Sequence, residues 1–276
     1  MVAETGRERR TRADGTPPRA AAYAERIGDL YRDYLEATPP DARFHRYIHA
    51  HSRNRAALLR HIGAFLAYAP WLDGARTVLD WGCRQAVDAC LVRMHLGGEV
   101  ELFGCDIDRG EFGTFHDFAG LRYTPLDHPW RLPYADEQFD VVIGSGTLEH
   151  AANDMRSLEE LWRVLRPQGR LILTFLPNAW SWTEGLNAAL GNEHHHRRYR
   201  RDDVRRMLLH SGFRPDVLRY HQLLPTATSG HRLANLPVVK GVLERAFRLN
   251  DAADRVWPLN RLAANHLVVA RKVPSF

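Results

Sequence analysis

The fold is decided by one stretch, Thr77-Val-Leu-Asp-Trp-Gly-Cys-Arg-Gln-Ala-Val87. A short apolar strand ends in an acidic residue, a tight glycine turn follows, and the chain continues as an amphipathic run typical of a helix. The next apolar run begins at Val100 and closes on a second acid, Asp106. In an open α/β sheet, the edge formed by the carboxyl ends of the strands binds the nucleoside part of a cofactor. The turn lacks the G-x-G-x-x-G pattern of a dinucleotide site, which argues against NAD.

Length and composition are those of a globular protein. The chain has 276 residues, of which 45% are apolar and 26% charged, enough for one large α/β domain with additions. No apolar run reaches the roughly 18 residues that a membrane-spanning helix needs, and the arginine-rich N-terminus lacks the apolar core of a secretory signal. Three cysteines, Cys83, Cys90 and Cys105, form no C-x-x-C pair. They indicate reduced thiols and hence a cytoplasmic protein.

The net charge of +5 gives little reason to expect a nucleic-acid partner. Nearly all of the basic residues are arginines, a bias that GC-rich coding also produces. One local segment, His194 to Arg219, carries eight arginines against three aspartates. This basic segment fits either a solvated helix face or an anionic small-molecule partner.

Strand and helix patterns alternate after residue 76, and they predict a doubly wound, mostly parallel seven-stranded α/β sheet of the Rossmann type. We expect a disordered tail over residues 1–19, an N-terminal helical cap over 20–72 and the main domain over 73–276. Two excursions, 177–199 and 222–264, interrupt the main domain, and the second should hold a helical insertion before the last strand. The expected strands are Thr77–Trp81, Val100–Cys105, Leu121–Thr124, Phe139–Ile143, Arg170–Phe175, Phe213–Tyr220 and Asn265–Val273. The expected helices are Ala20–Glu36, Ser52–Tyr68, Val87–Leu96, Glu111–Phe118, Asp154–Leu165, Arg201–His210 and Val238–Leu249, with a turn at Arg166–Gly169.

Several motifs in a fixed order make the chain resemble class I S-adenosylmethionine-dependent methyltransferases, in particular the small-molecule branch that includes ubiquinone-pathway O-methyltransferases. The resemblance covers about residues 75–215. Besides the first turn, it rests on Gly104-Cys-Asp106-Ile107, Leu132-Pro-Tyr-Ala-Asp-Glu-Gln-Phe-Asp-Val-Val142, Gly146-Thr-Leu-Glu-His150, Leu165-Arg-Pro-Gln-Gly-Arg-Leu171, His196-Arg-Arg-Tyr199 and Ser211-Gly-Phe213. It implies a Rossmann-like methyltransferase that uses S-adenosyl-L-methionine to methylate a small-molecule acceptor.

The cofactor-binding residues that the resemblance implies follow four strands: Asp80, Gly82, Cys83, Arg84, Asp106, Ile107, Asp127, His128, Ser145 and Gly146. Asp80 suits the cationic methionine end of the cofactor, and Gly82 lets the backbone approach it. Asp106 can accept both ribose hydroxyls. Asp127 and His128 are expected at the adenine, and the last two residues beside the reacting methyl group.

The first turn departs from the family pattern at Arg84 and Ala86, where glycines are usual. Arg84 could point to solvent, pair with the methionine carboxylate of the cofactor, or weaken cofactor binding. The third possibility would leave a non-catalytic cofactor-binding module.

An oxygen acceptor also needs a general base, and histidine suits neutral pH. His150, with Glu149 beside it, follows the fourth strand, and His196 lies in the first excursion. The alternatives are that His150 caps or packs a helix and that His194–His196 form a solvated loop. Glu193 and these histidines are possible metal ligands. Adjacent histidines cannot all converge on one ion, however, so no metal is expected.

The acceptor is expected to be a small molecule, anionic or aromatic, methylated at a hydroxyl oxygen. Trp180, Trp182 and Tyr199 suit an aromatic or sugar pocket, or simply pack the first excursion onto the core. N- or C-methylation of a sugar, glycan or natural-product intermediate remains the alternative chemistry. The sequence does not indicate an oligomeric state.

Overall fold

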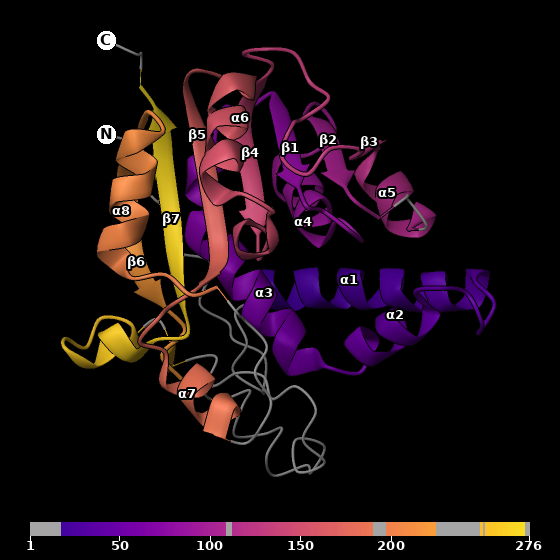
Figure 1. Ribbon diagram of the computed structural model, residues 1–276. Helices are drawn as coiled ribbons and strands as arrows, with labels where there is room; N and C mark the ends of the chain where they lie inside the picture. The colour runs from indigo at the N-terminus through magenta and orange to yellow at the C-terminus, as the bar shows by residue number, and fades with distance from the viewer. Residues whose placement is uncertain (1–17, 109–111, 190–196, 225–248, 251, 274–276) are drawn as a thin grey trace, which may run out of the picture.

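Seven strands of the described chain form one sheet in the order β3-β2-β1-β4-β5-β7-β6 (Figure 1). The computed structural model describes residues 18–108, 112–189, 197–224, 249–250 and 252–273. Strands β1 to β5 are parallel neighbours, and β7 is antiparallel to both β5 and β6. The doubly wound, mostly parallel α/β sheet is therefore confirmed. The strands are β1 Thr77–Trp81, β2 Glu101–Asp106, β3 Leu121–Pro125, β4 Phe139–Ser145, β5 Leu165–Pro177, β6 Phe213–His221 and β7 Asn265–Lys272.

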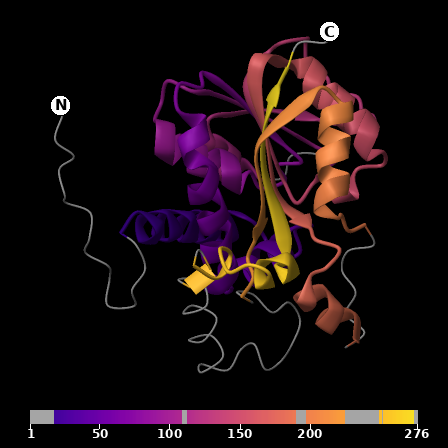
Figure 2. The ribbon, with the colours of Figure 1, turned by 90° about the vertical axis from the view of Figure 1, so that its left-hand side faces the viewer.

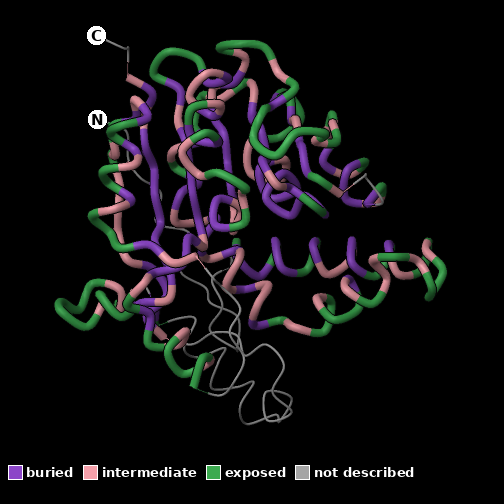
Figure 3. Tube along the Cα trace, viewed as in Figure 1, coloured by how far each residue is buried: buried purple, intermediate pink, exposed green. Residues whose placement is uncertain are grey.

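Helices cover both faces of the sheet, because the strands bury apolar side chains on both sides. Val78 and Ile143 join the core under α4 and α5, whereas Leu79 and Val142 join the core under α6 and α8. Figure 2 shows the sheet with α8 on one side and the cap on the other, and Figure 3 shows the strands as the most continuously buried part. These helices are α4 Val87–Leu96, α5 Gly113–Ala119, α6 Asp154–Val164 and α8 Arg201–His210.

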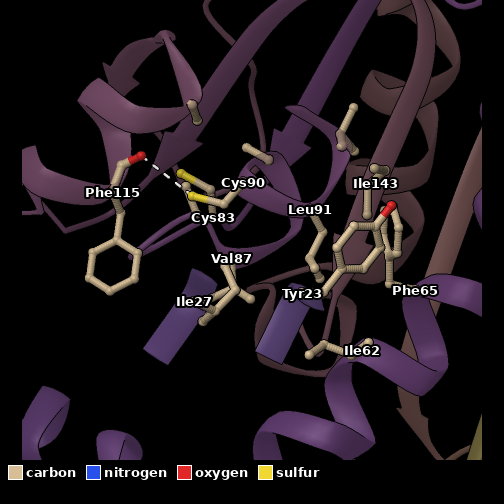
Figure 4. Close-up of a cluster of buried hydrophobic side chains, with 14 of the residues drawn as sticks. Tyr23, Ile27, Ile62, Phe65, Cys83, Val87, Cys90, Leu91, Phe115 and Ile143 are labelled. Atoms are coloured by element: carbon tan, nitrogen blue, oxygen red, sulfur yellow. Dashed lines mark hydrogen bonds between the residues drawn. The ribbon is translucent and has the colours of Figure 1, made fainter. Parts of the chain in front are cut away.

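The N-terminal cap consists of α1 Pro18–Ala37, α2 His45–Ser52, α3 Arg55–Tyr68 and the short η1 Ala69–Leu72. Its apolar face packs on α4 and α5, so that Ile27 of α1, Ile62 of α3 and Leu91 of α4 share one core (Figure 4). In the same cluster the Cys90 thiol donates to the Phe115 carbonyl at 3.4 Å. Each such buried side chain contributes roughly 1.5–3 kcal/mol. The cap is therefore held firmly over one edge of the sheet.

Several element boundaries differ from the sequence expectation, and three of them are informative. The helix predicted over Ser52–Tyr68 begins at Arg55, because Asn54 caps α3 by accepting a hydrogen bond from the Ala57 amide at 3.0 Å. The preceding helix α2 was not predicted from the sequence. The turn predicted at Arg166–Gly169 lies inside β5, where Gln168 has a φ of +65° and the register against β4 shifts. It is a bulge in a continuing strand. Helix α1 begins at Pro18, two residues before the predicted start at Ala20, and residues 1–17 of the expected tail lie outside the described residues.

The two excursions are described in part. The first contains α7 Trp182–Ala189, and the second contains η4 Leu259–Leu262. Most of the helix predicted over Val238–Leu249 lies outside the described residues, as do Glu193, His194, His195 and His196. No helix in the described ranges is long and apolar enough to span a bilayer.

Candidate cofactor and acceptor site

A pocket of about 650 Å³ lies at the carboxyl ends of β1, β2 and β4, under the cap. Its lining comes from the turn after β1, from the ends of β2 and β4, from η2 Leu148–His150, from β5 and from α1 to α3. The volume is in the range of sites that enclose a small ligand. The sheet edge and the cap therefore build the site together.

The turn after β1 has the backbone of a glycine-rich loop although only one glycine is present. Gly82 has a φ of +71°, and a Cβ there would come within 2.5 Å of the Thr147 hydroxyl oxygen. Arg84 and Ala86, at the two departures from the family pattern, also take left-handed conformations, with φ values of 43° and 57°. A non-glycine residue in that region costs roughly 1–2 kcal/mol. The loop therefore keeps its shape at a cost in stability.

Two buried acids anchor this loop. Asp106 accepts hydrogen bonds from the Arg84 amide at 2.9 Å and from the Asp108 amide at 3.1 Å. A carboxylate has about four acceptor positions, so capacity remains for two hydroxyl groups in the pocket. Asp80 accepts a hydrogen bond from the Ala89 amide at 3.1 Å. Burial, together with the neighbouring Asp88 carboxylate, holds the pKa of Asp80 well above its usual range.

The Arg84 side chain is half-exposed, lines the pocket and contacts the cap. Its guanidinium lies over the Tyr47 ring of α2, 5.1 Å from the centroid, and its Nε is 3.6 Å from Asp108. Arg43, just before α2, also reaches Asp108, at 3.0 Å. We call Arg43, Tyr47, Arg84 and Asp108 the cap latch, because they tie the cap to the loops after β1 and β2.

Most of the site residues expected from the sequence come together in the pocket. Ten of them line it: Asp80, Gly82, Cys83, Arg84, Asp106, Ile107, Ser145, Gly146, Glu149 and His150. Asp127 and His128 do not, and Leu126 and Pro129 line the wall there instead. The His128 ring accepts hydrogen bonds from the backbone amides of Trp130 and Arg131 at 3.4 and 3.0 Å, and these bonds stabilise the turn that His128 begins. The candidate base His196 lies outside the described residues.

The aromatic residues singled out from the sequence do not line the pocket. Trp182 donates to the Leu223 carbonyl at 2.8 Å, and the buried Tyr199 donates to Asp154 at 3.3 Å. Within the described ranges, no group of three or more histidine, cysteine, aspartate or glutamate side chains could hold a metal ion.

Lining residues that were not predicted from the sequence include Arg60, His61, Asp88 and Phe175. Phe175 has a φ of +55° at the second bulge of β5. Its ring lies 5.0 Å from the Arg60 guanidinium and 5.4 Å from the His61 ring. For Arg60 and His61, the signal in the sequence is the local polarity of α3, a helix otherwise rich in apolar residues.

The sheet order, the glycine turn after β1 and the acid that ends β2 define a class I methyltransferase domain whose cofactor is S-adenosylmethionine. Residues 79–173 match the family model described as a methyltransferase domain. Two solved S-adenosylmethionine-dependent methyltransferases share the fold. The one from Thermotoga maritima has a TM-score of 0.56 and 14% identity, over 84% of this chain and 98% of that one. The one from Archaeoglobus fulgidus has a TM-score of 0.54 and 18% identity, over 82% and 99%.

Curated relatives match part of the chain. A demethylmenaquinone methyltransferase of Listeria welshimeri is 33% identical over 119 residues, which cover 40% of this chain and 50% of the relative. An arsenite methyltransferase of Halobacterium salinarum is 30% identical over 116 residues, covering 40% and 29%. The chain thus spans half or less of the length of these relatives.

Proposed function

We propose that this protein transfers the methyl group of S-adenosylmethionine to a hydroxyl oxygen of a small anionic acceptor, with a pocket histidine as general base. The observation that carries the proposal is that one pocket is lined both by the loop after β1 with Asp106 and by His51, His61, His150 and Arg60. When bound, the cofactor supplies an electrophilic methyl group on a sulfonium. The three buried, free cysteines support a cytoplasmic location.

The residues present fit the cofactor. Gly82 lines the pocket, and its missing Cβ leaves the room that the Thr147 side chain occupies against the turn after β1. Asp106 is oriented by two backbone amides and suits a ribose. Ile107, Leu126 and Pro129 offer an apolar wall for the adenine. This support weakens the alternative of a degenerate, non-catalytic module.

The anionic character of the acceptor is inferred from Arg60. This half-buried guanidinium lines the pocket over the Phe175 ring, and its Nε finds no hydrogen-bond partner among the described residues. A guanidinium in a sheltered wall binds carboxylate or phosphate groups strongly, with geometric selectivity. The Phe175 ring beside it offers a planar apolar contact.

Calorimetry with S-adenosylhomocysteine tests the cofactor half of the proposal. We expect binding by the wild type and a loss of at least about tenfold in affinity for Asp106→Ala, since a charged hydrogen-bond acceptor is removed. Asp216→Ala, on β6 away from the pocket, is the matched control. An absence of binding at millimolar ligand would contradict the proposal. Transfer of a tritiated methyl group to hydroxylated acids, followed by mass spectrometry, tests the acceptor half.

A further inference from the structure

We propose that His61 of cap helix α3 is the general base of the site, and that Asp88 of α4 positions its ring. This inference rests on the proposed function, because a base is needed only if the acceptor is a protonated nucleophile. It assigns the base to a residue of the cap and not to His150 on the sheet edge.

The geometry is that of a carboxylate–imidazole pair facing a cavity. His61 Nε2 lies 2.8 Å from Asp88 Oδ2, and 26% of the His61 side chain is exposed, whereas Asp88 is 5% exposed. A carboxylate only accepts hydrogen bonds, so Nε2 carries the donated proton and the neutral ring keeps its lone pair on Nδ1. No partner for Nδ1 is found among the described residues. This is the tautomer that can take a proton from the pocket.

Asp88 is itself held in place. The Tyr68 hydroxyl donates to its second oxygen at 2.5 Å. Burial alone would raise the pKa of Asp88, but the charge and hydrogen bond of His61 and the hydrogen bonds of Tyr68 and Ser145 outweigh it and lower the pKa. The carboxylate is therefore ionised at neutral pH and stabilises the imidazolium that forms when His61 takes a proton. Asp80, behind it, is the acid of this buried pair that holds a proton more readily.

His61 also lies where an acceptor must sit. Its ring contacts Phe175 at the end of β5, beside Arg60, and its partner Asp88 interacts with Ser145 at the end of β4. A second histidine near it is His51 of α2, whose ring makes a hydrogen bond with the Tyr47 carbonyl at 2.9 Å and whose pKa is lowered by burial and by nearby cations. His150 is exposed on η2. His61 therefore has a buried carboxylate partner at Nε2 and, among the described residues, no hydrogen-bond partner at Nδ1.

The step balances without another reactant. The acceptor oxygen forms a bond to the methyl carbon while the bond from that carbon to sulfur breaks, and its electron pair stays on sulfur as the neutral thioether. The hydroxyl proton moves to His61 Nδ1 and then to solvent. No oxidation state changes in the protein.

The experiment measures tritiated methyl transfer to protocatechuate, salicylate and glycerol phosphate against pH, together with S-adenosylhomocysteine affinity. His61→Ala should lose about 100-fold or more in kcat, keep its S-adenosylhomocysteine affinity within about threefold, and regain activity with added imidazole. Asp88→Asn should lower kcat by about tenfold or more with little change in KM, since an amide no longer fixes the orientation and tautomer of the His61 ring. His210→Gln, on the exposed end of α8, is the matched control.

The outcomes separate the two proposals. Transfer by the wild type with undiminished transfer by His61→Ala would overturn this inference alone. Equal losses of S-adenosylhomocysteine affinity and turnover in His61→Ala would also overturn it, since they would make His61 a cofactor ligand. An absence of transfer by the wild type to every acceptor would overturn the proposed function and this inference with it. Retained cofactor binding shows that the variant is folded, and imidazole rescue is not expected of a structural residue.

Discussion

Replacing Gly82 with alanine tests whether the loop after β1 depends on one missing side chain. The alanine must adopt the φ of +71° that Gly82 has. Its added Cβ would lie 2.5 Å from Oγ1 and 3.0 Å from Cβ of Thr147. Thr147 cannot withdraw freely, because its hydroxyl donates to the Trp81 carbonyl at 3.1 Å. The left-handed backbone costs roughly 1–2 kcal/mol, and overpacking adds roughly 1–3 kcal/mol. We expect the free energy of unfolding to fall by about 2–5 kcal/mol.

The assay is thermal and urea unfolding of the wild type, Gly82→Ala and a matched control, with S-adenosylhomocysteine calorimetry on each. The control is Gly74→Ala, which has a similar φ of +80° but no heavy atom within 4 Å of the added Cβ. It should lose only the backbone part, about 1–2 kcal/mol, and no cofactor affinity. Adding Thr147→Ala to Gly82→Ala should recover part of the loss, because the two closest contacts disappear. If Gly82→Ala is no less stable than Gly74→Ala and binds the cofactor product equally well, the reasoning about this loop is wrong.

Three further predictions concern the latch, the acceptor and pH. Arg84→Ala and Asp108→Asn should each weaken S-adenosylhomocysteine binding severalfold in calorimetry, because both break the cap latch. The double variant should lose less affinity than the sum of the two single losses, and additive losses would contradict the cap latch. Arg60→Gln should raise KM for anionic acceptors by about tenfold or more and change kcat less, whereas an equal effect on a neutral hydroxylated acceptor would remove its assigned role. Burial lowers the pKa of His266 to about 4, so the unfolded chain binds its proton first as pH falls below about 6.5. Stability should therefore decline by about 3 kcal/mol between pH 6.5 and 4, and His266→Gln should flatten this part of the urea-unfolding profile, unlike His210→Gln.

The local elements were largely predictable because hydrophobic periodicity and turn chemistry are properties of short windows. Helices α4 and α8 have the predicted bounds, and strand β1 does as well. The errors lie where one residue changes the backbone: Asn54 caps a new helix, and Gln168 turns a supposed loop into a bulge. A capping side chain and a left-handed residue depend on neighbours that sequence spacing does not show.

The sequence by itself determined the sheet, the turn after β1 and the acids that follow the first two strands, since strand ends of a parallel sheet meet at one edge. The tertiary structure alone decided what faces them. His61 and Asp88 lie 27 residues apart and meet only because α3 packs on α4. Arg84 stands where the family usually has glycine, yet its backbone takes the left-handed conformation that glycine favours. Its side chain is part of the cap latch. A pocket wall forms where two packed elements face each other, and the sequence of either element alone does not determine how they pack.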